Sequence, residues 1–248
     1  STAEFAIRPF IAQYPDQVMR QMLLWSSHNN EHLRRLASEG CRPRLPWAPS
    51  LQCLIKDPSP SLIILENLKN DDSLYVKKSV ANHLNDISKD HPHIVLKIAK
   101  DWFGKTNNTN WIIKHALRTL LKKGDKQALA IFGLDNSKSL NIKELTLSKS
   151  KLKIGEYLHF DFEVLNNSSQ ERSIRLEYKV AFVKANGSTS PKVFQISEFQ
   201  LKGNSSKHFS RKQWFKELST RKHYSGKHTI TLVINGDEKE VISFLLTD

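Results

Sequence analysis

A change in the spacing of apolar residues divides this chain and constrains its fold more than any other feature. Up to about residue 134, apolar residues recur every three or four positions, as at Val76, Val80, Leu84 and Ile87, which is typical of amphipathic helices. Beyond about residue 143 they alternate with polar residues, as in the segment 160–164, which is typical of half-buried strands. The sequence therefore predicts a multidomain chain, α-helical first and β second.

The helical part consists of short helices and contains an internal repeat. Its helix breakers are Pro15, the segment 43–49, Pro58, Pro60, Pro92, Gly104 and Gly124. Segments 33–37, 76–80 and 113–117, offset by 43 and 37 residues, each place an aliphatic residue before two basic-type residues. This period suits paired-helix HEAT units, which stack into a curved solenoid with a concave face. Because the chain starts at Ser1 inside a helical pattern, we expect further helices upstream in the parent protein.

Turn signals separate the predicted strands of the second part. They lie at 166–167, 186–187, 203–204 and 235–236, at the spacing of a β-sandwich. Both cysteines, Cys41 and Cys53, precede this part, so an immunoglobulin-like sandwich here would lack a disulfide. We expect a HEAT-like α-solenoid in residues 1–136, a linker in 137–142 and an immunoglobulin-like β-sandwich in 143–248.

The chain is strongly basic in both parts. It has 38 Lys and Arg against 25 Asp and Glu, giving a formal net charge of +13. Residues 1–136 contribute +6 (19 minus 13) and residues 137–248 contribute +7 (19 minus 12). This surplus favours nucleic acid over an anionic membrane or an acidic protein as partner, although it could also serve solubility alone.

The sequence lacks the motifs of several other chemistries. It contains no Walker loop, GxGxxG or HExxH, and neither cysteine lies in a CxxC pair or beside plausible histidine ligands. We therefore expect no metal and no cofactor. Unpaired cysteines indicate a reducing compartment. No apolar run is long enough to cross a bilayer and no signal peptide is visible, so we expect a cytoplasmic protein with no membrane partner.

The second helix of each repeat has a polar face that is mostly basic. Its members are Lys78, Asn82, Asn85, Asp86 and Lys89, then Trp111, His115, Arg118 and Lys122, with the pairs Arg35–Glu39 and Glu4–Arg8 earlier in the chain. These faces could be solvated and carry ordinary i,i+4 ion pairs. However, Glu4, Glu39 and Asp86 would oppose phosphate binding. Carboxylates in a basic surface are more readily explained by a cation that they must meet.

Two long segments carry a family resemblance. Residues 34–49 (RRLASEGCRPRLPWAP) and 79–92 (SVANHLNDISKDHP) resemble the AlkC-type DNA glycosylases of bacteria, and residues 4–10 and 111–124 extend the match. The resemblance implies a HEAT-like enzyme that excises bases made cationic by alkylation, namely 3-methyladenine and 3-methylcytosine. It also implies a lesion held at the duplex surface rather than flipped into a deep pocket. Some members carry an immunoglobulin-like domain after the solenoid. The implied partner is double-stranded DNA with alkylated bases, bound by a monomer associated with the bacterial nucleoid.

The resemblance also places the site residues. The implied catalytic set is Glu4, Glu39, Asp86 and Trp47. We expect Asp86 to position or activate water and the two glutamates to stabilise positive charge, while Trp47 packs on the sugar or the base; the alternative for Trp47 is a place in the core. The residues expected to contact phosphates are Arg35, Arg42, Arg44, Lys78, His115 and Arg118. In the β domain, basic residues near turns are weaker candidates for a DNA clamp: Lys207, His208, Arg211, Lys212, Arg221 and Lys222.

Two other functions fit the same sequence. A HEAT solenoid could be a non-catalytic scaffold for an acidic protein, because fold alone does not establish catalysis. The chain could also be a DNA-binding module that senses lesions without cutting the glycosidic bond. Both alternatives predict that no base is released and that the carboxylates are dispensable.

Overall fold

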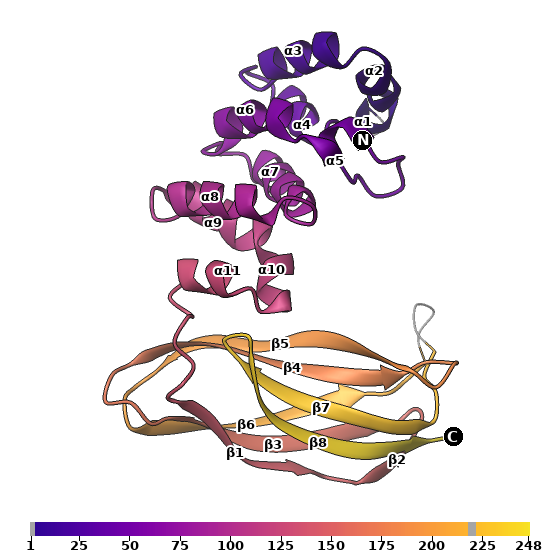
Figure 1. Ribbon diagram of the computed structural model, residues 1–248, viewed down its shortest axis with the longest axis vertical. Helices are drawn as coiled ribbons and strands as arrows, with labels where there is room; N and C mark the ends of the chain where they lie inside the picture. Colours follow the sequence, from indigo (N-terminus) through magenta and orange to yellow (C-terminus); the bar gives the residue numbers. More distant parts are fainter. Residues whose placement is uncertain (1–2, 218–221) are drawn as a thin grey trace. The chain divides into compact units, whose positions relative to one another are not determined.

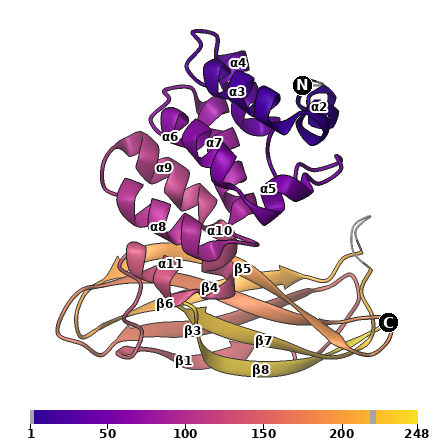
Figure 2. The ribbon, with the colours of Figure 1, turned by 45° about the horizontal axis from the view of Figure 1, so that its top comes forward.

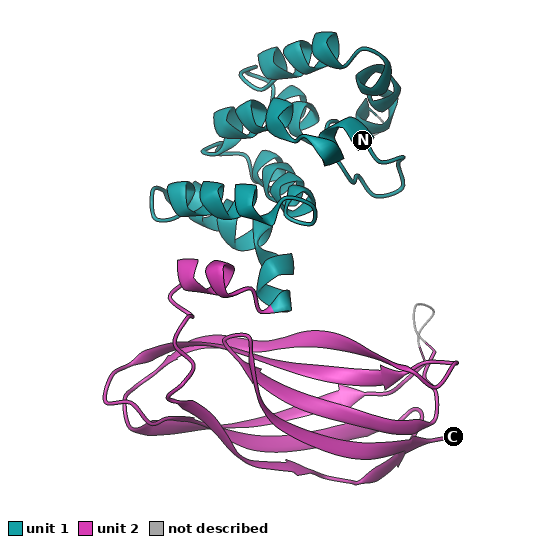
Figure 3. Cartoon of the chain, viewed as in Figure 1, with its two compact units in different colours: residues 1–123 teal, residues 124–248 magenta. Residues whose placement is uncertain are grey.

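A computed structural model describes residues 3–217 and 222–248, and the chain forms two compact units, residues 1–123 and 124–248 (Figure 3). The division falls earlier than the expected boundary at residue 136. The reason is helix α11 (Lys126–Ile131), whose Leu129 packs against Gly236 and whose Lys126 pairs with Asp237. The first strand begins at Leu140, inside the expected linker.

The first unit is built from short helices, as the breakers predicted. These are α1 (Ala3–Ala6), α2 (Arg8–Gln13), α3 (Pro15–Trp25), α4 (Glu31–Glu39), α5 (Gln52–Lys56), α6 (Ser59–Leu68), α7 (Leu74–Ile87), α8 (Pro92–Trp102), α9 (Asn107–Ala116) and α10 (Arg118–Lys123). Prolines occupy the first turns of α2, α3, α6 and α8, where no backbone donor is needed. Asn30 caps α4, and Thr106 forms a capping box with Thr109 at α9.

Helix pairs stack along this unit, which confirms the predicted repeat. Helix α7 packs between α4 and α9, and α3 packs against α4 and α6 (Figures 1 and 2). The apolar stripe of α7 is fully buried at Val76, Val80 and Leu84. The polar residues of α4, α7 and α9 are therefore carried on neighbouring helices of one layer.

The second unit contains two packed sheets, which confirms the predicted sandwich. Its strands are β1 (Leu140–Leu147), β2 (Lys151–Lys153), β3 (Tyr157–Asn166), β4 (Arg172–Val183), β5 (Thr189–Leu201), β6 (Ser205–Trp214), β7 (Gly226–Ile234) and β8 (Asp237–Thr247). The strand orders are β1-β3-β6 and β2-β8-β7-β4-β5, antiparallel except for the β2–β8 pair. The alternating residues Phe160, Phe162 and Val164 are buried between the sheets.

One pair of residues in this unit departs from simple alternation. Arg175 and Glu177, expected on a polar face of β4, are 4% and 1% exposed and pair at 2.7 Å. Burial of this pair is tolerated because Glu198 also contacts Arg175 at 2.6 Å.

The β7–β8 turn at Asn235-Gly236 has two positive φ angles, 50° and 79°, as the sequence predicted. Gly236 is required there, because a Cβ would lie 2.9 Å from the Cα of Gly124.

None of the helices formed by residues 3–217 and 222–248 is both long and apolar enough to span a membrane.

Candidate active site

The three predicted carboxylates lie in one connected row of ion pairs, which we call the charged chain. It comprises Glu4, Arg35, Glu39, Arg42, Asp86 and Lys89. Arg35 contacts Glu4 at 3.2 Å and Glu39 at 3.7 Å. Arg42 contacts Glu39 at 2.7 Å and Asp86 at 2.8 Å. The row therefore joins α1, the end of α4, the loop that follows α4, and α7.

The carboxylates of the charged chain are buried and already paired. Asp86 is 2% exposed, Glu4 5% and Glu39 7%. Burying a charge is costly unless a counter-ion and hydrogen bonds accompany it. Three cations match the three carboxylates here, and the hydroxyl of Ser79 donates to Glu39 at 2.7 Å. The site holds several negative side chains while its formal charge stays near zero.

Local charges set the ionisation of two members of this row. Burial alone would raise the pKa of Glu4, but hydrogen bonds and charge from Arg35 outweigh it and hold that pKa below its ordinary value. Burial alone would lower the pKa of Arg42, but Glu39 and Asp86 outweigh it and raise that pKa. Both groups are therefore charged at neutral pH.

The burial and pairing of Arg42 do not fit its predicted role as a phosphate contact. Its side chain is 8% exposed, and its guanidinium pairs with the carboxylates of Glu39 and Asp86. A guanidinium held in this way orients Glu39 and Asp86 and has little surface to offer a phosphate. Sequence reasoning could not separate it from Arg44, two residues later, because the contact that buries Arg42 comes from Asp86, 44 residues away.

Trp47 is not in the core: it is 98% exposed, on the loop between Arg42 and Leu51. The backbone amide of Ala48 donates to the carbonyl of Leu45 at 3.3 Å, which closes a turn with Pro46 and Trp47 at its centre. Trp47 has a φ of 63°, the left-handed conformation that a type II turn assigns to glycine. For a tryptophan this conformation costs about 1–2 kcal/mol. The loop thus presents a large aromatic ring to solvent at the expense of backbone strain.

Arg8 supports this loop, and sequence reasoning gave it no site role. It is 3% exposed, and its guanidinium donates to the carbonyls of Gly40 at 3.1 Å, Arg42 at 2.8 Å and Pro49 at 2.6 Å. The sequence offered one signal of its burial, because Arg8 lies three residues before the buried Ile11 and therefore on the inward face of α2.

His83 is a second buried polar residue that the sequence did not reveal. Its Nδ1 lies 2.9 Å from the carbonyl of Ser38, so it carries the proton and ties α7 to α4 beside Glu39. Complete burial lowers the pKa of His83 to about 3. The ring is therefore neutral at physiological pH and acts as a structural donor.

Cationic and aromatic side chains lie farther along the same layer. His115 stacks on Trp111 with ring centroids 4.6 Å apart. Burial, and then the charges of Arg118 and Lys78, lower the pKa of His115, so this ring is neutral rather than a cation for phosphate. Arg118 donates to the side chain of Asn82 at 3.0 Å and remains partly exposed. The structure thus brings Lys78, His115 and Arg118 together.

Two other predicted phosphate contacts have acidic partners but keep some exposure. Arg44 pairs with Asp90 at 2.8 Å, and its side chain is 38% exposed. Arg35 stacks over the ring of Tyr75 at 4.6 Å, and its side chain is 14% exposed. Arg44 is therefore the more accessible of the two.

The basic candidates of the β domain lie mainly on a strand rather than near turns. Lys207, His208, Arg211 and Lys212 all belong to β6. Lys207 and Arg211 lie over the ring of Phe209, and Lys212 lies over Tyr157, which stacks on Trp214. Lys222 lies near Tyr224, and Arg221 falls outside the described residues.

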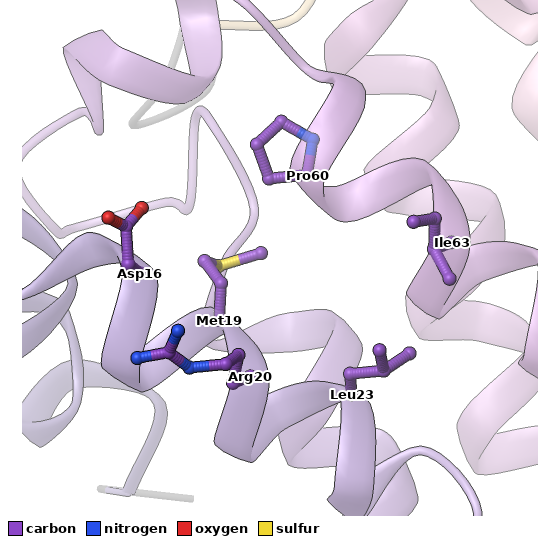
Figure 4. Close-up of a pocket in the computed structure, with 6 residues that line it drawn as sticks. All are labelled: Asp16, Met19, Arg20, Leu23, Pro60 and Ile63. Carbon is purple, nitrogen blue, oxygen red and sulfur yellow. The ribbon is translucent and has the colours of Figure 1, made fainter.

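A pocket between α3 and α6 is separate from these groups. It has a volume of about 270 Å³ and is lined by Asp16, Met19, Arg20, Leu23, Pro60 and Ile63 (Figure 4). None of its lining residues belongs to the charged chain. Within residues 3–217 and 222–248, no group of three or more His, Cys, Asp or Glu side chains is arranged to hold a metal ion.

Comparison with known proteins identifies the family. Residues 1–120 match the family model described as "DNA alkylation repair enzyme", and residues 141–248 match the C-terminal immunoglobulin-like domain of YhaZ. The uncharacterized protein YhaZ of Bacillus subtilis (strain 168) is 53% identical over 244 residues, 98% of this chain and 68% of that protein. The fold matches Pseudomonas fluorescens alkylpurine DNA glycosylase AlkC, solved with DNA containing an abasic site analog. In that match the TM-score is 0.96 and the identity 39%, over 99% of this chain and 68% of that one. The chain therefore belongs to the AlkC-type DNA alkylation repair family, with a helical repair domain followed by a YhaZ-type immunoglobulin-like domain.

Proposed function

We propose that this protein is a DNA glycosylase that releases cationic N3-alkylated bases, 3-methyladenine and 3-methylcytosine, from double-stranded DNA. The observation that carries the proposal is the charged chain, which gathers Glu4, Glu39 and Asp86 beside the loop that exposes Trp47. A scaffold for an acidic protein has no evident use for three buried carboxylates in a basic layer.

The proposed chemistry uses the positive charge of the lesion. Alkylation at N3 makes the base cationic, so it leaves with the electron pair of the glycosidic bond as a neutral molecule. Water attacks C1′, and its proton passes to a carboxylate. Fixed carboxylates stabilise the oxocarbenium-like sugar by Coulomb attraction, which is stronger in a site with reduced dielectric. Trp47 would pack on the sugar or the exposed base, and an aromatic face also attracts a cation.

Asp86 is the carboxylate best placed to receive that proton. Its Oδ2 is held by the buried Arg42, whereas its Oδ1 accepts from Lys89 at 3.0 Å. The side chain of Lys89 is 41% exposed and can leave for solvent or for a phosphate at little cost. Oδ1 would then be free to orient the attacking water, while Glu39 and Glu4 remain paired and stabilise charge.

Exposed cations would bind the phosphates around the lesion. Lys78, Arg118 and Arg44 suit this role, with a smaller part for Arg35, and the cations of β6 would hold the duplex from the second domain. Contacts of this kind position DNA and make binding depend on salt. We propose that a monomer performs this work, without metal or cofactor, in the bacterial cytoplasm at the nucleoid.

Release of free base from an oligonucleotide with one 3-methyladenine or 3-methylcytosine tests the proposal. Asp86→Asn should retain DNA affinity while single-turnover release falls at least a hundredfold, and Glu39→Gln should also slow release. Asp16→Asn, at an exposed carboxylate of α3, is the matched control and should match the wild type. If Asp86→Asn and Glu39→Gln both release base normally, the assigned roles are wrong. If the wild type releases no base, the enzyme proposal fails, and lesion-selective binding then distinguishes a sensor from a scaffold.

A further inference from the structure

We propose that Arg8 is a positioning residue. It holds the backbone of the loop of residues 42–51 in the conformation that places Trp47 and Arg42 for the proposed reaction. This proposal rests on the function proposed above. It adds a residue that touches neither the lesion nor the reacting atoms. Arg8 would act through the loop backbone.

The contacts of Arg8 are unusual for a buried cation. Within the part of the chain that the structure describes, the hydrogen bonds of its guanidinium all go to backbone carbonyls and none to a carboxylate. Nε and Nη2 converge on the carbonyl of Pro49 at 3.2 and 2.6 Å. Nη1 donates to the carbonyls of Gly40 at 3.1 Å and Arg42 at 2.8 Å. One side chain thus ties both ends of the loop to helix α2.

These anchor points enclose the residues that the site needs. The carbonyl of Arg42 belongs to the residue whose guanidinium bridges Glu39 and Asp86. The carbonyl of Pro49 lies two residues after Trp47. Just beyond the second anchor, the amide of Leu51 donates to the carbonyl of Pro43 at 3.0 Å. Between the anchors, the side chain of Leu45 is buried. The loop is therefore held at its base, while its tip carries the exposed ring.

The strain at Trp47 explains why such an anchor is useful. A tryptophan with φ of 63° persists only where its surroundings fix the backbone. Because Trp47 is 98% exposed, its own side chain supplies almost no packing in the free protein. The turn itself and the anchors at its base must therefore hold the backbone in this conformation.

Lysine could not replace arginine in this role. The five donors of a guanidinium lie in one rigid plane and can serve separated acceptors, whereas a lysine ammonium is a single point on a flexible stem. Arg8→Lys keeps the charge but loses most of the four hydrogen bonds. Release should fall about tenfold or more, because a misplacement of about 1 Å caused by a substitution far from the chemistry can slow a reaction about a hundredfold. The Kd for undamaged DNA should stay within about twofold.

The first test combines kinetics with a probe of Trp47. Protein containing 5-fluorotryptophan has five labelled positions, and Trp47→Phe identifies the Trp47 resonance by ¹⁹F NMR. In Arg8→Lys we expect this resonance to shift or broaden while the other four stay in place. Arg20→Lys, at an exposed arginine of α3, is the matched control and should change neither the spectrum nor release. A merely structural role would lower thermal stability without singling out one tryptophan.

The second test is a double-mutant cycle. If Arg8 acts through the loop, Arg8→Lys should slow release much less in a Trp47→Ala background than in the wild type. Equal slowing in both backgrounds, with an unchanged Trp47 resonance, overturns the proposal. Pro46→Gly loosens the exposed turn without touching a buried charge, and it should reproduce the loss of release if Arg8→Lys does not fold. If wild-type protein releases no base, the proposed function fails, and the Trp47 resonance alone then decides whether Arg8 holds the loop.

Discussion

Replacing Trp47 by glycine should stabilise the free protein while it abolishes most base release. The ring is 98% exposed, so its removal forfeits almost no buried apolar surface. The left-handed φ of 63° costs a tryptophan about 1–2 kcal/mol, and glycine adopts it without that cost. Glycine also loses more chain entropy on folding, about 0.5–1 kcal/mol. The net gain for Trp47→Gly is therefore about 0–1.5 kcal/mol, with a central value of about 0.75 kcal/mol.

Trp47→Ala separates backbone strain from the loss of the ring. Alanine has a Cβ and keeps the strain, so its free energy of unfolding should match that of the wild type within about 0.5 kcal/mol. Urea unfolding followed by circular dichroism at 222 nm measures the difference. A gain of 1 kcal/mol moves the midpoint by about 0.3–1 M at ordinary slopes. Both variants should release base equally slowly, because both lack the ring.

Two results would contradict this reasoning. If Trp47→Gly is less stable than the wild type, the ring packs on the protein in solution. If alanine stabilises as much as glycine, the positive φ is not the source of the strain. A glycine variant with full activity would instead leave the backbone argument intact and remove Trp47 from the proposed site.

Two further predictions concern ionisation and domain limits. His83 has a folded-state pKa of about 3 and an ordinary value near 6.5 when unfolded, so the unfolded chain binds more protons and stability falls as pH drops from about 6.5 toward 3. His83→Asn keeps a donor for the Ser38 carbonyl but cannot titrate. Its urea midpoint should therefore depend less on pH between 6 and 4 than that of the wild type. If the midpoints of both proteins change equally with pH, the low pKa assigned to His83 is contradicted. Residues 124–248 expressed alone should be clearly more stable to urea than residues 143–248, which lack α11 and the buried Leu140 and Ile142 of β1; equal stability would show that α11 is not part of this unit.

The period of the apolar residues was sufficient to predict the architecture, because helices and strands bury residues at different spacings. It could not assign α11 to a unit. A short amphipathic helix shows that one face is buried but does not show which surface covers it, and the contacts of Leu129 with Gly236 span more than a hundred residues. The burial of Arg175 and Glu177 could not be predicted either, because it depends on long-range pairing, whereas alternation alone predicts a solvated face for both.

The candidate site could be predicted in its members but not in its connections. Spacing and resemblance located Glu4, Glu39 and Asp86, and the structure joins them through two arginines. The sequence could not distinguish a buried Arg42 from an accessible Arg44, or decide whether Trp47 is inside or outside. A tryptophan is apolar enough for a core and is equally suited to a contact surface. The turn at Pro46 offered a weak signal, because proline at this position favours a bend at the surface.

The neutrality of the charged chain bears on how a surface site could select damaged bases. Free carboxylates would repel phosphates, so pairing them with Arg35, Arg42 and Lys89 would allow undamaged DNA to approach in the proposed function. An ordinary base brings no positive charge and gains nothing from displacing Lys89. In the proposed reaction, a cationic base and the sugar left behind it would gain, because they would interact with the negative charge of Asp86 when the ammonium of Lys89 leaves. If the proposed function holds, an exchange of cations at Asp86 would supply the selectivity that many glycosylases obtain from a deep pocket.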